Sequence, residues 1–250
     1  MSPHDEGLPT DPNDPRLQGW YHTIDLGNGL VSRGANDHRP VVDRYGIPAS
    51  LAGKSVLDVG TFDGFWAFEM ERRGAERVVA IDVARLADFD WLPARLLDLE
   101  DSGANRASHF ELARTMRGSR VERKVCSVYD LSPEKVGMFD VVFCGDVLLH
   151  LFNPLQALIN IRSVTRELAI IQSSLDPEIE TSRPEAPWIR FGLEGLEEVP
   201  GQHCTYWIFS TKALCTMMRY AGFTSTEPQG KFTIPGGPVS TSVIGRVTPR

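Results

Sequence analysis

From Ser55 onward, the chain alternates short apolar runs with segments in which apolar residues recur at helical spacing. The runs Ser55–Val59 (SVLDV) and Arg77–Asp82 (RVVAID) are typical of buried strands, and the segment 65–73 between them has the spacing of a helix that Gly74 ends. Continuously apolar strands separated by helices are typical of parallel sheets that are covered on both faces. The sequence therefore predicts an α/β fold with a doubly wound, mostly parallel sheet.

The same pattern divides the whole chain into expected elements and regions. Seven strands are expected at 55–59, 77–82, 124–128, 139–144, 168–172, 223–228 and 242–247, and helices at 39–45, 65–73, 104–116, 154–164 and 211–220. The Pro-rich residues 1–15 predict a flexible tail, 16–49 a flap followed by a helix, and 50–250 the main domain. Asn28-Gly29 predicts a hairpin tip in the flap. The stretch 176–207 is long for a connection and predicts an inserted lid.

The charge and cysteine content disfavour several classes of protein. A net charge of -7 argues against a protein that binds nucleic acid through clustered Lys and Arg. The basic run 117–124 is interpreted as a solvated helix end or loop. None of the four cysteines forms a CxxC pair, so neither a zinc site nor a redox motif is expected. Without a signal-peptide pattern or an apolar run of membrane-spanning length, the chain is expected to be cytoplasmic.

The turn from Asp58 to Gly64, which follows the first strand, is the main candidate for a ligand site. Ligands of doubly wound sheets bind outside the carboxyl ends of the strands, where glycine lets the backbone approach them closely. The turn has Gly60 and Gly64 but lacks the G-x-G-x-x-G pattern that holds a dinucleotide pyrophosphate. Asp82 ends the second strand, 22 positions after Gly60, where a carboxylate can accept both hydroxyls of a ribose. This combination favours S-adenosylmethionine over a dinucleotide, the alternative being a plain βα turn.

Three segments carry a family resemblance: VLDVGTFDGFWAFEMERRGAERVVAIDV, FDVVFCGDVLLHLFNPLQAL and TKALCTMMRYAGF. They resemble class I S-adenosylmethionine-dependent methyltransferases over about 50–250, which implies a Rossmann-like, seven-stranded fold. More narrowly, Val147, Leu148, His150 and Pro154 match a pattern of the group that includes the bacterial tRNA wobble-uridine carboxymethyl transferase. The opening WYHTIDLGNGLVSRG resembles small stand-alone members of that group, among them a mycobacterial methylmannose polysaccharide 1-O-methyltransferase.

The chain also departs from the tRNA-modifying members of this group. Leu149 stands where those members have Tyr, and Leu151-Phe152-Asn153 replaces their basic residues. The chain is also expected to differ from them in having no sizeable N-terminal extension. These differences favour ordinary S-adenosylmethionine over its carboxylated form. They also argue against a nucleic-acid partner.

The resemblance implies a set of cofactor contacts at the carboxyl ends of the strands. The first turn would surround the methionine part, Asp82 would hold the ribose, and the segment after the third strand would line the adenine pocket. The implied cofactor-binding residues are Asp58, Gly60, Thr61, Phe62, Asp63, Gly64, Asp82, Val83, Ser127, Val128, Tyr129 and Gly145.

Methyl transfer to a weakly acidic hydroxyl calls for a general base, and histidine suits neutral pH. His150, just past the fourth strand, is the first candidate, and a structural role at the start of the next helix is its alternative. Asp146 is a second candidate, as base, as a contact to the methionine amino group, or as a metal ligand together with a neighbour. His203 could complete the site from the lid. No cluster has convincing metal-ligand spacing, and a Mg²⁺ site of dispersed carboxylates stays open.

Aromatic residues next to polar groups suit a sugar or an aromatic acceptor, with hydrophobic packing as the alternative reading. The residues expected to bind substrate are Trp20, Tyr21, His22, Trp188, Arg190, Tyr206 and Trp207. The sequence thus predicts an O-methyltransferase that acts on a hydroxyl of a carbohydrate or other small molecule, with oligomerisation possible and no membrane partner. The alternatives are a tRNA wobble-uridine-modifying transferase and a cofactor-binding protein without catalysis.

Overall fold

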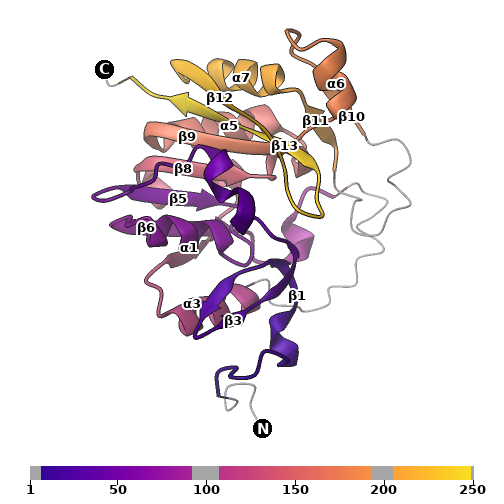
Figure 1. Ribbon diagram of the computed structural model, residues 1–250. Helices are drawn as coiled ribbons and strands as arrows, with labels where there is room; N and C mark the ends of the chain where they lie inside the picture. Colours follow the sequence, from indigo (N-terminus) through magenta and orange to yellow (C-terminus); the bar gives the residue numbers. More distant parts are fainter. Residues whose placement is uncertain (1–6, 92–106, 193–204, 249–250) are drawn as a thin grey trace.

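The computed structural model describes residues 7–91, 107–192 and 205–248. Within these ranges, seven strands form the central sheet in the order β12-β13-β9-β8-β5-β6-β7 (Figure 1). They are β5 (Ser55–Val59), β6 (Arg77–Asp82), β7 (Glu122–Val125), β8 (Phe139–Gly145), β9 (Thr165–Ser174), β12 (Ser225–Thr233) and β13 (Val239–Arg246). Only β13 runs antiparallel to its neighbours, and the other pairs from β9 to β7 are parallel. The predicted doubly wound, mostly parallel seven-stranded fold is confirmed.

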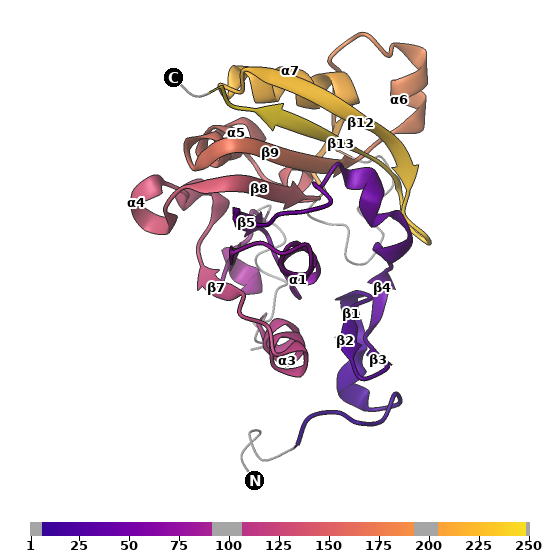
Figure 2. The same ribbon diagram turned by 60° about the vertical axis from the view of Figure 1, so that its left-hand side comes forward.

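Helices cover both faces of the sheet (Figures 1 and 2). Alternate strand residues belong to different cores, as Val56 and Leu57 of β5 show. On the face of Val56 lie α1 (Phe65–Arg72) and α3 (Ser108–Arg117). On the face of Leu57 lie α4 (Pro133–Val136), α5 (Pro154–Ser163) and α7 (Thr211–Tyr220). The strands are apolar along their length because both of their faces are buried.

The N-terminal residues form a flap beside α1 and α3 (Figure 2). After a 3-10 turn at Pro15–Leu17, β1 (Gln18–His22) pairs with β4 (Arg33–Asn36), and β2 (Asp25–Gly27) pairs with β3 (Leu30–Val31). Asn28 and Gly29 form the hairpin tip with φ of 53° and 77°, as expected from their sequence. A 3-10 helix, Arg39–Tyr45, then leads to the sheet. The flap is held to α3 by the Trp20 ring, which stacks on His109 at 4.5 Å.

Two expectations from the sequence are wrong in detail. β7 ends at Val125 rather than at residue 128, because the Ser127 hydroxyl accepts a hydrogen bond from Tyr129 N and caps a 3-10 turn at Val128–Asp130. The basic run 117–124 is not merely a helix end or loop: it ends α3 and continues into the edge strand β7. Its Arg123 guanidinium lies over the Phe110 ring, 5.8 Å from the centroid.

The part of the chain expected to form a lid contains ordered structure on both sides of residues 193–204, which lie outside the described ranges. It includes α6 (Pro177–Ser182) and the antiparallel pair β10 (Ile189–Phe191) and β11 (Trp207–Phe209). Among the helices of the described ranges, none has the length and apolar character needed to cross a bilayer.

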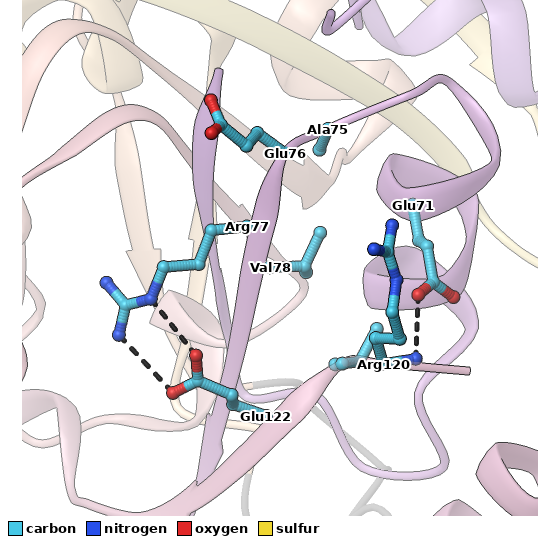
Figure 3. A pocket seen from close by; sticks show the side chains of 8 residues that line it. Glu71, Ala75, Glu76, Arg77, Val78, Arg120 and Glu122 are labelled. Atoms are coloured by element: carbon cyan, nitrogen blue, oxygen red, sulfur yellow. Dashed lines mark hydrogen bonds and ion pairs between the residues drawn. The ribbon is translucent and has the colours of Figure 1, made fainter. Parts of the chain in front are cut away.

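A small depression at the N-terminal ends of β6 and β7 is lined by charged residues that bind one another (Figure 3). Arg77 donates from Nε and Nη2 to the two carboxylate oxygens of Glu122, at 3.1 and 3.3 Å. Arg120 donates its backbone N–H to Glu71 at 2.8 Å. Exposed pairs of this kind contribute little to stability. They lie at the end of the sheet away from the candidate turn.

Candidate functional site

A cavity of about 1260 Å³ opens at the carboxyl ends of β5, β6 and β8, between the sheet and the flap. Its wall combines residues from the flap, the first turn, the loop after β8 and β11. Binding sites of this fold are expected at this edge of the sheet. The volume exceeds that of an ordinary small-molecule site of roughly 300–1,000 Å³, so the cavity has room for a cofactor and a second molecule.

The turn after β5 presents its backbone to this cavity. Gly60, Phe62 and Gly64 have φ of 74°, 50° and 95°, in the region that favours glycine. Gly60 N donates to the Ile81 carbonyl at 2.9 Å, which ties the turn to β6. A Cβ on Gly60 would lie 2.4 Å from Cγ2 of Val147, so only glycine fits between the turn and the loop after β8.

Asp82 holds the turn from the end of β6. Its carboxylate accepts hydrogen bonds from Phe62 N at 2.9 Å and from Val83 N at 2.8 Å. The side chain is nearly buried and lines the cavity. A carboxylate fixed in this way at the cavity wall is an acceptor for hydroxyl groups, which fits the ribose contact expected from the sequence.

Asp58 lies beneath the turn and does not line the cavity. Its Oδ2 has no hydrogen-bond partner within standard geometry among the described residues, and the Thr61 side chain is the polar group that most favours its charged form. Burial raises the pKa of Asp58 to about 7. A buried carboxylate with an unused acceptor, next to a cavity, fits a ligand that carries positive charge.

The wall expected to contact adenine is organised by Asp90. Val83, Ser127, Val128 and Tyr129 all line the cavity. The Tyr129 hydroxyl donates to Asp90 Oδ2 at 2.5 Å, and the same oxygen accepts from Phe152 N at 2.5 Å. Burial and this carboxylate raise the pKa of Tyr129 well above its usual range. Asp90 therefore joins the segment after β6 to the turn after β7 and to the loop before α5.

Gly145 and Asp146 complete the cavity at the end of β8. Asp146 has a left-handed backbone, with φ of 48°. Its carboxylate accepts from Gln172 Nε2 at 2.9 Å and from Ser174 N and Oγ at 2.8 and 3.0 Å. Because both oxygens are used by β9, this geometry suits a residue that shapes the cavity better than one that takes a proton.

Of the two histidines proposed as catalytic, the structure describes His150 but not His203. His150 ends a 3-10 turn, Leu148–His150, and lines the cavity half-buried, with its backbone N–H donating to the Val147 carbonyl at 3.0 Å. His203 lies outside the described residues.

Of the residues expected to bind substrate, Tyr21, His22 and Trp207 line the cavity. Trp207 is fixed by its Nε1, which donates to the Leu151 carbonyl at 2.7 Å. The other four do not reach the cavity wall. Trp20 is buried against α3, and Tyr206 is buried with its hydroxyl donating to the Asp90 carbonyl. Trp188 and Arg190 lie on β10, where Arg190 pairs with Asp176 at 2.7 Å.

The sequence reasoning missed several residues of the cavity. Among them are Asn36, His38, Asp90, Gln172 and Ser174. His38 is buried, its Nδ1 lies 2.6 Å from the Tyr45 hydroxyl, and burial together with nearby His22 lowers the pKa of His38 to about 3. The available signal was the pair of histidines, 22 and 38, in one short segment before the first strand.

Comparisons with known proteins agree with this geometry. A model of the family described as "Methyltransferase domain" matches residues 35–227. The ubiquinone biosynthesis O-methyltransferase of Chromobacterium violaceum is 34% identical over 113 residues, which is 45% of this chain and 39% of that enzyme. The Xanthomonas oryzae enzyme of the same name is 38% identical over 114 residues, again 45% and 39% of the two chains. The chain thus matches about two fifths of the length of these relatives.

Solved structures share the fold at low identity. The N-terminal domain of EvdMO1, crystallised in the presence of SAH and D-fucose, superposes with a TM-score of 0.61 at 16% identity and covers 93% of both chains. The magnesium protoporphyrin IX methyltransferase of Synechocystis PCC 6803 has a TM-score of 0.55 at 16% identity, over 84% of this chain and 81% of that one.

The protein belongs to the methyltransferase domain family, and its sheet is that of the class I S-adenosylmethionine-dependent methyltransferases. The family and the fold class expected from the sequence are confirmed. The narrower resemblance to the tRNA-modifying and methylmannose enzymes is not reproduced among these relatives. Within the described residues, no group of three His, Cys, Asp or Glu side chains is placed to hold a metal ion, so nothing there supports Mg²⁺.

Proposed function

We propose that the protein is an S-adenosylmethionine-dependent O-methyltransferase that acts on a hydroxyl of a carbohydrate or other small molecule. The observation that carries the proposal is the Asp82 carboxylate, held against the Gly60–Gly64 turn at the mouth of a cavity large enough for two molecules. The family match supports methyl transfer as the chemistry.

The cofactor is placed by residues of the turn and the adjacent strand ends. Asp82 would hold the ribose, Val83 and Tyr129 would flank adenine, and Gly60 would allow the methionine part to approach the backbone. Asp58, with its unused Oδ2, would face the positive charge from below. Once bound, S-adenosylmethionine supplies an activated methyl group, and the protein has to position the acceptor and remove its proton.

The acceptor would bind on the flap side of the cavity. Tyr21, Trp66 and Trp207 offer aromatic faces there, and His22, His38 and His150 offer hydrogen bonds to hydroxyl groups. In the described part of the chain, no Lys or Arg lines this cavity. That favours an uncharged acceptor over a nucleic acid, and ordinary over carboxylated S-adenosylmethionine. Names of the relatives, which include O-methyltransferases, support a hydroxyl as the acceptor.

Calorimetry with S-adenosylhomocysteine tests the cofactor site. We expect binding by the wild type and a loss of about tenfold or more for Asp82→Ala, since a charged hydrogen-bonding group contributes about 1.5–3 kcal/mol. Arg77→Gln, at the opposite end of β6, is the matched control and should bind like the wild type. No binding to the wild type, or equal affinity of Asp82→Ala, would refute the site.

Methyl-labelled cofactor tests the acceptor class. Neutral sugars and phenols should accept the label, and their phosphorylated or carboxylated counterparts should accept it poorly. His150→Ala should slow transfer to any accepted compound while it leaves cofactor affinity within about threefold. Labelling of tRNA that weakens steeply with salt would favour the alternative function instead.

A further inference from the structure

His22 and Asp63 form a buried pair between the flap and the first turn. The backbone N–H of His22 donates to Asp63 Oδ2 at 2.7 Å, and its ring Nδ1 lies 2.5 Å from Asp63 Oδ1. The two residues are 41 positions apart, and their exposed fractions are 5% and 1%. One carboxylate therefore fixes both the chain and the ring orientation of the histidine.

The pairing determines which ring nitrogen can act on a molecule in the cavity. His22 lines the cavity, while Asp63 does not. A carboxylate that accepts from the backbone with one oxygen and faces Nδ1 with the other favours a proton on Nδ1. Nε2 then carries the lone pair and is the nitrogen left for the cavity. A histidine oriented by a carboxylate in this way is the usual arrangement of a general base.

The neighbouring groups favour His22 over His38 as the proton acceptor. His38 lies 5.0 Å away between ring centroids, and its Nδ1 is engaged with the Tyr45 hydroxyl. Tyr21 meets the His22 ring edge-on at 4.6 Å, and Phe65 stacks on it at 5.3 Å. These contacts hold the imidazole in one orientation between the flap and α1.

We propose that His22 is the general base of the reaction and that Asp63 is its positioning residue. The inference rests on the proposed function. The acceptor O–H bond breaks and its proton moves to Nε2 of His22. The oxygen forms the new bond to the methyl carbon as the S–C bond breaks, and that electron pair stays on sulfur.

Two readouts test this proposal. Nitrogen-15 NMR of the histidine rings reports the tautomer without any acceptor, and His22→Asn assigns the signal. We expect the Nδ1 proton to face Asp63, and a shift of that proton toward Nε2 in Asp63→Asn. With an accepted neutral sugar or phenol, His22→Asn should lower kcat by about 10²–10⁴-fold, the usual contribution of a general base. The Asn amide takes the place of Nδ1, so the flap contact and S-adenosylhomocysteine affinity should be kept.

His109→Asn is the matched control, because His109 also holds the flap but does not line the cavity. It should turn over like the wild type. The proposal is overturned if the His22 ring carries its proton on Nε2 and not on Nδ1, or if His22→Asn keeps wild-type kcat. Failure of the proposed function has a different signature, because the wild type would then bind no S-adenosylhomocysteine whatever the tautomer of His22.

Discussion

Replacing Asp58 by Asn should stabilise the protein by an amount that grows with pH. Asp58 is fully buried, its Oδ2 has no partner among the described residues, and burial raises its pKa from 3.8 to about 7. Asn has nearly the same shape and stays neutral at every pH. The variant therefore removes the free-energy cost of a buried charge and little else.

The sign and size of the effect follow from the shift. A folded pKa above the unfolded value means that stability is full below about pH 4, declines between pH 4 and 7, and is constant above pH 7. At 1.36 kcal/mol per pKa unit, the charged form costs on the order of 4 kcal/mol at pH 8. For a chain of this size, that corresponds to a melting temperature roughly 10 °C higher in Asp58→Asn at pH 8.

Thermal melts of the cofactor-free protein at pH 5 and pH 8 measure this difference. The gain of Asp58→Asn should be small at pH 5 and large at pH 8. Asp140 provides a control of opposite sign. Burial raises its pKa, but hydrogen bonds from Ser55 N–H and Oγ together with the Arg166 guanidinium outweigh burial and lower the pKa of Asp140. Asp140→Asn should lose stability at both pH values and recover only below about pH 4. An Asp58→Asn gain that is equal at pH 5 and pH 8 would refute the argument.

Three further outcomes are expected. Gly60→Ala should lower the melting temperature and abolish cofactor binding. Adding Val147→Ala to this variant should restore only part of both, because the positive φ at position 60 remains strained; full restoration would show that the clash alone matters. Asp90→Asn should weaken S-adenosylhomocysteine binding about tenfold in calorimetry, through loss of a charged acceptor. Arg77→Gln should change the unfolding free energy by less than about 1 kcal/mol in denaturant titrations, and a larger loss would make its exposed pair with Glu122 structural.

Local pattern predicted the main sheet well. Two strands have the predicted bounds, Ser55–Val59 and Arg77–Asp82. Each is a mainly apolar run, and its last residue lines the cavity. The end of β7 was predicted poorly, since a single side-chain cap at Ser127 decides where the strand stops. The unpredicted pair β10 and β11 depends on residues far apart in the sequence.

The parts of the site that lie close together in the sequence were predicted, and the contacts between distant residues were not. The turn and Asp82 follow from one βαβ unit. Other contacts join residues from separate elements, namely those of Asp90 and the pair of His22 with Asp63. No spacing in the sequence predicts these contacts. Trp20 and Tyr206 show the converse: an aromatic next to a site in sequence can turn its ring into the core instead.

The bond between Asp63 and His22 also limits how this protein can be engineered or diversified. A natural engineering step is to transplant the flap between relatives in order to change the accepted compound. Here its last β1 residue is anchored by the turn itself, so a grafted flap that lacks histidine at position 22 would leave a buried carboxylate without its partner. The flap and the residue at position 63 therefore have to be exchanged together, because each is needed to satisfy the other.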